Sequence, residues 1–163
     1  MKGLDASEII SEQLWIGSAP NKEDLVQLKK EIGPKLVVVD LTRTQEEEAE
    51  CQKEGIRYDD RTPRIEDDYS PITIPRLKLV ARIIDDNISS GRRVFLHCKA
   101  GLGRSPTCVA AYLVHCGTSL TEAREMVTSK REVWKGRDAD YADLLAEFAK
   151  MQEISRVENP SFM

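Results

Sequence analysis

The apolar residues along this chain follow two alternating patterns, which predict short strands separated by amphipathic helices. The clearest strand covers residues 36–41, a nearly unbroken run of β-branched and leucine residues with Asp40 inside it. Such runs are typical of strands that are buried on both faces of a parallel sheet. Shorter strands are predicted at residues 9–10, 14–17, 56–58 and 94–97.

Helices are predicted where apolar positions recur every three to four residues between start and stop signals. Asn21 opens a helix over residues 22–32, and Gly33 and Pro34 close it. The helix over residues 44–54 carries a Thr44-x-x-Glu47 pattern, which predicts a reciprocal capping box. Further helices are predicted at residues 75–89, 106–116 and 119–128, and around residues 141–151.

This alternation predicts an α/β fold, a single domain with a mainly parallel central sheet of four to five strands flanked by helices. The domain is expected to cover residues 1–157, and residues 158–163 are expected to form a C-terminal tail. A chain of 163 residues suffices for one sizeable core.

Composition and charge exclude several classes of function. The formal charge is −4, with 32% charged residues, which argues against a nucleic-acid partner bound through a general positive field. No apolar run approaches the roughly 18–20 residues that span a membrane. The N-terminus lacks the apolar stretch of a secretory signal, so a cytoplasmic protein with no membrane partner is expected. The four cysteines show no disulfide framework.

Candidate chemistry is concentrated between the predicted strand at 94–97 and the predicted helix at 106–116. Ligands of such sheets bind beyond the carboxyl ends of the strands. Glycines allow loop N–H groups to turn inward, and the next helix points its N-terminus at the same centre. An arginine there can bind two phosphate oxygens at once. The loop reads His97-Cys98-Lys99-Ala100-Gly101-Leu102-Gly103-Arg104-Ser105, and residues 99–104 are its expected phosphate-binding part.

Cys98 is the candidate nucleophile at the bottom of this loop. A field that binds phosphate also stabilises a thiolate, which is then positioned to attack phosphorus. The expected intermediate is a cysteinyl-phosphate that water hydrolyses. Ser105 is placed to hydrogen-bond the departing sulfur, and His97 is expected to orient the loop through hydrogen bonds.

The order His97-Cys98, five residues, Arg104 and Ser105 resembles the signature of the cysteine-based protein tyrosine phosphatase superfamily, in particular the small dual-specificity phosphatases. The resemblance implies a protein-tyrosine-phosphatase-like fold and a phosphoprotein substrate carrying phosphotyrosine, phosphoserine or phosphothreonine. It implies no metal and no cofactor.

The family also places an aspartate about thirty residues before the cysteine, as the general acid. Asp67 fits the family pattern, 31 residues before Cys98 and four before Pro71. Asp68 is the direct alternative, and Asp59 and Asp60 are weaker candidates because they lie nearer the preceding strand.

Other functions stay open at this point. Lys99 is typical of phosphoinositide phosphatases of the superfamily, although Leu102 replaces their second loop lysine. RNA 5′-phosphatase activity, a non-catalytic phosphate-binding module and a rhodanese-like sulfurtransferase are further alternatives. Some relatives protect the nucleophile through a second cysteine, a role that Cys51 could take, and Arg137 could contact the substrate phosphate. Both residues also fit ordinary structural roles.

Overall fold

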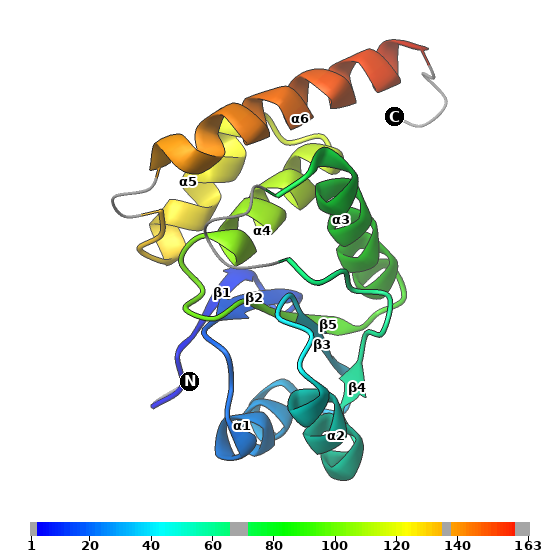
Figure 1. Ribbon diagram of the computed structural model, residues 1–163, viewed down its shortest axis with the longest axis vertical. Coiled ribbons are helices and arrows are strands. Elements are labelled where there is room, and N and C mark those ends of the chain that lie inside the picture. Colours follow the sequence, from blue (N-terminus) through cyan, green and yellow to red (C-terminus); the bar gives the residue numbers. More distant parts are fainter. Residues whose placement is uncertain (1–2, 66–71, 135–137, 159–163) are drawn as a thin grey trace.

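Five strands form one central sheet in the computed structural model, which describes residues 3–65, 72–134 and 138–158 (Figure 1). The strands are β1 (Ala6–Ile10), β2 (Leu14–Gly17), β3 (Leu36–Asp40), β4 (Arg57–Tyr58) and β5 (Arg93–His97). Their order in the sheet is β1-β2-β5-β3-β4. The β1 and β2 strands pair antiparallel, whereas β2–β5, β5–β3 and β3–β4 pair parallel. The predicted α/β fold with a mainly parallel sheet of four to five strands is therefore confirmed.

Helices cover both faces of the sheet (Figure 1). They are α1 (Lys22–Ile32), α2 (Gln45–Glu54), α3 (Ile74–Ser89), α4 (Arg104–His115), α5 (Leu120–Lys130) and α6 (Asp138–Glu158). The run in β3 shows why two layers form, because alternate side chains of a strand point to opposite faces. Val37 and Val39 join the core that includes α3 to α6, whereas Leu36 and Val38 join the core of α1 and α2.

The parallel pairing of β3 and β5 places their carboxyl ends side by side. Asp40, the last residue of β3, is in register with His97, the last residue of β5. The candidate loop starts at the next residue, Cys98. The sheet therefore brings the acidic end of β3 to the base of the loop.

Among the predicted boundaries that differ from the structure, two concern the candidate loop and the expected tail. The helix expected from residue 106 begins at Arg104, so Arg104 and Ser105 lie in its first turn rather than in the loop. The expected tail began at Glu158, which still belongs to α6, and residues 159–163 lie outside the described part of the chain.

Candidate active site

The candidate loop joins the buried end of β5 to the N-terminus of α4. Gly103 is the N-cap of α4, and no side chain caps that end. The first N–H groups of a helix have no partner within the helix, so they remain available to an anion. The helix dipole favours negative charge at the same point.

Two glycines in the loop are required for different reasons. Gly101 has a φ of +70°, and an added Cβ would lie 2.4 Å from the backbone oxygen of Gly17. A left-handed backbone and this close approach both demand glycine there. Gly103 has no positive φ, but an added Cβ would lie 2.9 Å from the Tyr141 hydroxyl oxygen. The sequence argument from unusual dihedral angles therefore holds for Gly101, whereas space is the constraint at Gly103.

The loop is held in shape from outside through its carbonyl groups. The Ala19 N–H donates to Lys99 O (2.8 Å), and the Trp134 N–H donates to Leu102 O (2.7 Å). In a planar trans peptide the C=O and the following N–H point in opposite directions. Carbonyl groups that face outward therefore aim the next N–H groups into the loop.

One N–H group of the loop points toward the Cys98 sulfur. The Gly101 N–H donates to Cys98 Sγ, at 3.3 Å. Cys98 is 2% exposed, and burial is the largest influence on its thiol, where it raises the pKa. The Ser105 side chain and N–H, the Arg104 charge and the Gly101 N–H together outweigh burial, so the pKa of Cys98 lies below its ordinary value. A thiol with a lowered pKa supplies more of the nucleophilic thiolate.

Ser105 lies beside this sulfur in the first turn of α4. Its hydroxyl oxygen is buried and forms no hydrogen bond of normal geometry among the described residues, while its side chain lies close enough to Cys98 to lower the pKa of that thiol. Because a buried hydroxyl without a partner costs free energy, an interaction with Cys98 explains its position. Cys98 and Ser105 therefore lie together at the base of the loop and the start of α4, and the predicted role of Ser105 toward the departing sulfur stays a prediction.

Arg104 is the first residue of α4 and is 7% exposed. Its Nη1 donates to the backbone oxygen of Ile65, at 2.8 Å, which holds the guanidinium in place. A pocket of about 320 Å³ opens beside it. The residues lining this pocket are Ala19, Thr42, Thr44, Arg64, Ile65, Lys99 and Arg104.

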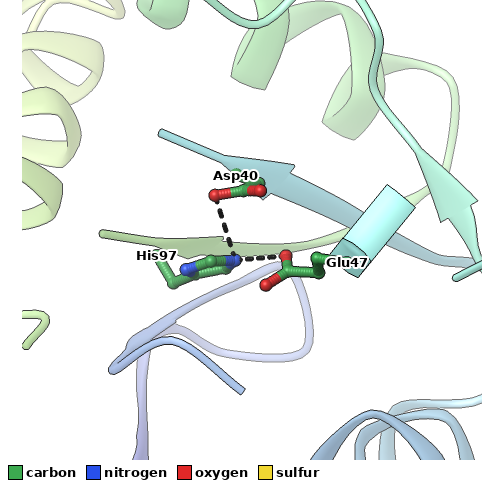
Figure 2. Close-up of side chains that lie close together, drawn as sticks. All are labelled: Asp40, Glu47 and His97. Atoms are coloured by element: carbon green, nitrogen blue, oxygen red, sulfur yellow. Dashed lines mark hydrogen bonds and ion pairs between the residues drawn. The ribbon is translucent and has the colours of Figure 1, made fainter. Parts of the chain in front are cut away.

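His97 connects the loop to a buried acidic pair, as Figure 2 shows. Its Nδ1 lies 2.9 Å from Cys98 O, and its Nε2 lies 2.5 Å from a Glu47 carboxylate oxygen and 3.5 Å from Asp40 Oδ1. The Cys98 carbonyl can only accept, so Nδ1 donates to it, and with Glu47 ionised Nε2 donates as well, which makes the ring an imidazolium. Burial raises the pKa of Glu47, but Asp40, whose own pKa is lowered, also faces Nε2 and favours the charge on the ring. Burial disfavours this charge, but Glu47 and Asp40 outweigh burial and raise the pKa of His97. The expected role of His97 in orienting the loop agrees with this geometry.

The predicted capping box of α2 is wrong in its second half. Thr44 does cap the helix, because its side chain accepts from the Glu47 N–H. Asp40 Oδ2, however, accepts from the Thr44 N–H at 3.1 Å, a bond that the box assigned to Glu47. Asp40 thereby leaves the Glu47 carboxylate available to His97.

Asp40, Glu47 and His97 are also a candidate metal site, since their ligand atoms all lie within 4.8 Å of one another. The existing hydrogen bonds explain the cluster without an ion. Asp40 accepts from the Thr42 hydroxyl (2.5 Å) and the Tyr58 hydroxyl (2.8 Å). The His97 Nε2–H is already donated to Glu47. The cluster therefore serves as a hydrogen-bonded support beneath the loop.

The His97–Glu47 pair predicts a dependence of stability on pH. The unfolded histidine titrates near pH 6.5, and the folded pKa is higher. The stabilisation is thus fully present below about pH 6.5 and is lost as the pH rises through the folded pKa. Glu47→Gln removes the carboxylate that holds this proton. We expect the variant to lose about 2 kcal/mol of unfolding free energy near pH 6, the scale of a hydrogen bond to a charged group, and less near pH 9.

Urea denaturation of wild type and Glu47→Gln at about pH 6, 7.5 and 9 measures this effect. Glu46→Gln is the matched control, because Glu46 is exposed on the same helix. A destabilisation by Glu47→Gln that does not change with pH would contradict the assignment of the proton to His97.

Of the candidate general acids, Asp59 lies within the described residues, whereas Asp67 and Asp68 do not. Asp67, Asp68 and Pro71 lie outside the described residues, as does Arg137. Asp59 is buried and binds Arg61 at 2.9 Å. Burial raises the pKa of Asp59, but Arg61 and other hydrogen-bond donors outweigh it, so that the pKa is lowered. A carboxylate held ionised in an ion pair is unsuited to donate a proton.

The remaining predicted residues lie at the surface or away from the loop. Lys99, Ala100 and Leu102 are exposed at the mouth. Cys51 is fully buried in the core of α1 and α2, where burial, reinforced by nearby carboxylates, raises its pKa to about 12. Cys51 is therefore a neutral thiol near pH 7. A disulfide between Cys51 and Cys98 stays a prediction.

Arg131 is among the residues that contact the loop and that the sequence reasoning missed. Arg131, at the end of α5, donates to the backbone oxygens of Ala100 and Gly101. An arginine thirty residues beyond a loop carries no local signal of this contact.

In the described part of the chain, no helix is both long enough and apolar enough to cross a membrane.

Residues 14–151 match the family model described as the catalytic domain of dual specificity phosphatases. This match includes the sheet strands β2 to β5, the candidate loop and α4.

Two curated relatives match shorter segments. A putative tyrosine phosphatase 123R of Invertebrate iridescent virus 6 is 37% identical over 70 residues, which is 42% of this chain and 49% of that protein. Dual specificity protein phosphatase 1-A of Xenopus laevis is 45% identical over 51 residues, 31% of this chain and 14% of that protein. The matches thus span half or less of these relatives.

Solved structures extend the likeness to the whole fold. A crystal structure of PTPMT1 has a TM-score of 0.74 and 23% sequence identity, and the alignment covers 94% of this chain and 99% of that one. At this identity the likeness concerns the fold.

Proposed function

This chain belongs to the dual-specificity phosphatase family, and on that premise we propose that it is a cysteine-dependent protein phosphatase. The observation that carries the proposal is the buried Cys98 thiol with a lowered pKa, at the base of a loop in which the Gly101 N–H donates to the sulfur. The proposed substrate is a phosphoprotein carrying phosphotyrosine, phosphoserine or phosphothreonine. The chemistry requires neither a metal nor a cofactor.

In the first step, the Cys98 thiolate attacks phosphorus, and an S–P bond forms as the P–O bond to the leaving group breaks. Inward N–H groups and the Arg104 guanidinium hold the equatorial phosphoryl oxygens, where negative charge develops. We assign to Asp67 the proton that neutralises the departing phenoxide or alkoxide. The product is a cysteinyl-phosphate.

In the second step, water attacks phosphorus and the S–P bond breaks, with its electron pair returning to sulfur. Asp67, now a carboxylate, takes the proton of the attacking water. Ser105 donates its hydroxyl hydrogen to the departing sulfur, a role supported by the absence of another partner for this oxygen among the described residues. Inorganic phosphate then leaves the loop.

The exposure of the loop supports a broad choice of phosphorylated side chains. Lys99, Ala100 and Leu102 reach the surface, with Leu102 43% exposed. We take this exposure as support for a shallow phosphate site. Phosphoserine and phosphothreonine are short, and a shallow site is what they require. Phosphotyrosine enters the same site with its ring against the mouth.

A phosphoinositide substrate is the second candidate. The pocket beside the loop carries Arg64 and Lys99 as well as Arg104. Two additional cations favour a substrate with a further anionic group next to the scissile phosphate. A panel of phosphotyrosine, phosphoserine and phosphothreonine peptides, set against soluble inositol phosphates, tests the choice. A kcat/KM higher for inositol phosphates than for every peptide would overturn the protein-phosphatase assignment.

The assignment of Asp67 predicts the pH dependence of turnover. Asp67→Asn removes the proton donor, so we expect kcat to fall about 10²–10⁴-fold, the range of general acid catalysis. The fall of activity on the basic side of the pH–rate profile should also vanish, because that limb reports deprotonation of the acid. The measurement is kcat for an aryl phosphate across the pH range.

Asp68→Asn is the matched comparison for Asp67→Asn. The two residues are adjacent, and the substitutions change charge and volume equally. A larger loss in Asp68→Asn would transfer the role to Asp68, and wild-type turnover in Asp67→Asn would refute our assignment.

A further inference from the structure

Two carbonyl groups at the tip of the loop are held by a side chain rather than by backbone N–H groups. Arg131 Nε donates to Gly101 O at 2.9 Å, and its Nη2 donates to Ala100 O at 3.2 Å. Arg131 follows α5 as its C-cap residue. One guanidinium therefore binds the loop through its carbonyl groups.

The same guanidinium is fixed from its other edge by the start of the chain. Nη1 and Nη2 donate to the two carboxylate oxygens of Asp5, at 2.8 and 3.0 Å, and Nη1 also donates to the Ser7 hydroxyl at 3.2 Å. The side chain of Arg131 is 8% exposed, whereas that of Asp5 is 57% exposed. Arg131 thus fills the space between the loop and β1.

Every donor of Arg131 is used in this arrangement. A guanidinium has five N–H groups in a rigid fork, and five hydrogen bonds leave Arg131, two to the loop and three to Asp5 and Ser7. A lysine has three donors on one atom and cannot reproduce this geometry. Because no N–H remains, Arg131 acts on the protein itself rather than on a substrate.

The contact with Ala100 reaches the nucleophile through one peptide plane. The peptide group that presents Ala100 O to Arg131 presents the Gly101 N–H on its opposite side. That N–H donates to Cys98 Sγ. Rotation of this peptide would release the carbonyl from Arg131 and turn the N–H away from the sulfur in the same movement.

We propose that Arg131, held in place by Asp5, is a positioning residue that fixes the orientation of the loop peptides at Ala100 and Gly101 for phosphoryl transfer. The proposal rests on the proposed phosphatase function. It assigns to the residue that precedes β1, Asp5, a part in maintaining the active loop. Arg131 touches neither substrate nor sulfur, and its effect passes through the backbone.

Three variants separate the contributions of the Arg131 charge, the Arg131 donors and the Asp5 carboxylate. Arg131→Met removes the charge and all five donors, Arg131→Lys keeps the charge, and Asp5→Asn keeps the shape of the partner without its charge. Lys130→Met is the matched control, because it removes one positive charge at the adjacent, exposed position. Each protein is assayed for kcat and KM with an aryl phosphate.

A second measurement reports on the loop without requiring turnover. Iodoacetamide alkylates a thiolate, so the pH dependence of Cys98 modification, followed by mass spectrometry, reports how well the loop stabilises the sulfur. Cys116, which is exposed, is the internal reference in the same sample. A residue that only stabilises the fold would lower the melting temperature and leave this profile unchanged.

We expect Arg131→Met to lower kcat/KM about 10- to 100-fold, the cost of a small misplacement of catalytic groups. The Cys98 alkylation profile should move to higher pH. Arg131→Lys and Asp5→Asn should show the same changes to a smaller extent, and Lys130→Met should show neither. If Arg131→Met does not fold, these two milder variants carry the test with the same expected direction.

The proposal would be overturned if the alkylation profile of Arg131→Met, or of the two milder variants, coincided with that of wild type. Failure of the proposed function has a different signature. Wild type would then be as inactive as Cys98→Ser, while the alkylation profiles would still report whether Arg131 orients the loop.

Discussion

Replacement of Cys98 by serine is expected to lower the turnover of an aryl phosphate by about 10⁴-fold or more, as the loss of a covalent nucleophile does. The lowered pKa of Cys98 increases the ionised share of this thiol at a given pH. A serine hydroxyl in the same position stays protonated, so the field of the loop no longer activates the attacking atom. Because serine is nearly isosteric, the loop should still bind inorganic phosphate with an affinity close to that of wild type.

The measurement combines kcat/KM in the presence of EDTA with phosphate binding by calorimetry. Cys116→Ser is the control, since that thiol is exposed and lies at the far end of α4 from the loop. Substantial activity in Cys98→Ser would refute the covalent mechanism. An inactive wild type that binds phosphopeptides would instead indicate a non-catalytic binding module.

Local patterns were sufficient to predict the fold and the position of the loop. The strands at the centre of the sheet are short apolar runs, and the helices carry periodic apolar faces with Asn21, Thr44 and Ser119 as caps. Each of these signals lies within a dozen residues of sequence. The loop motif is equally local, because Cys98 and Arg104 are separated by five residues.

The supports of the loop could not be predicted, because they join distant parts of the chain. Glu47 lies 50 residues from His97, and its local pattern indicated a capping box. The competing bond from the Thr44 N–H to Asp40 depends on where β3 ends. Asp5 and Arg131 are 126 residues apart. Only the packing of β1, α5 and the loop against one another brings these charges together.

Arg104 carries the second of the two largest expected effects. Arg104→Lys retains the charge but loses the planar fork that binds two phosphoryl oxygens at once. We expect kcat/KM to fall about 10³-fold, within the range known for arginines that stabilise phosphoryl transfer. In Arg104→Met, which also loses the charge, kcat/KM should fall about 10-fold further. The measurements are kcat and KM for an aryl phosphate, with Arg76→Lys as the control on an exposed helix position.

The stability of these variants separates the two contacts of Arg104. Its Nη1 holds Ile65 O, and the Ile65 N–H in turn donates to Leu41 O at 2.9 Å. Loss of a buried hydrogen bond costs about 1–3 kcal/mol, which is too little to unfold a domain of ordinary stability. If Arg104→Lys loses much of its kcat/KM but no more unfolding free energy than this, the lost activity reflects weaker stabilisation of the transition state. Turnover within tenfold of wild type would show that the Arg104 fork does not hold the phosphoryl group.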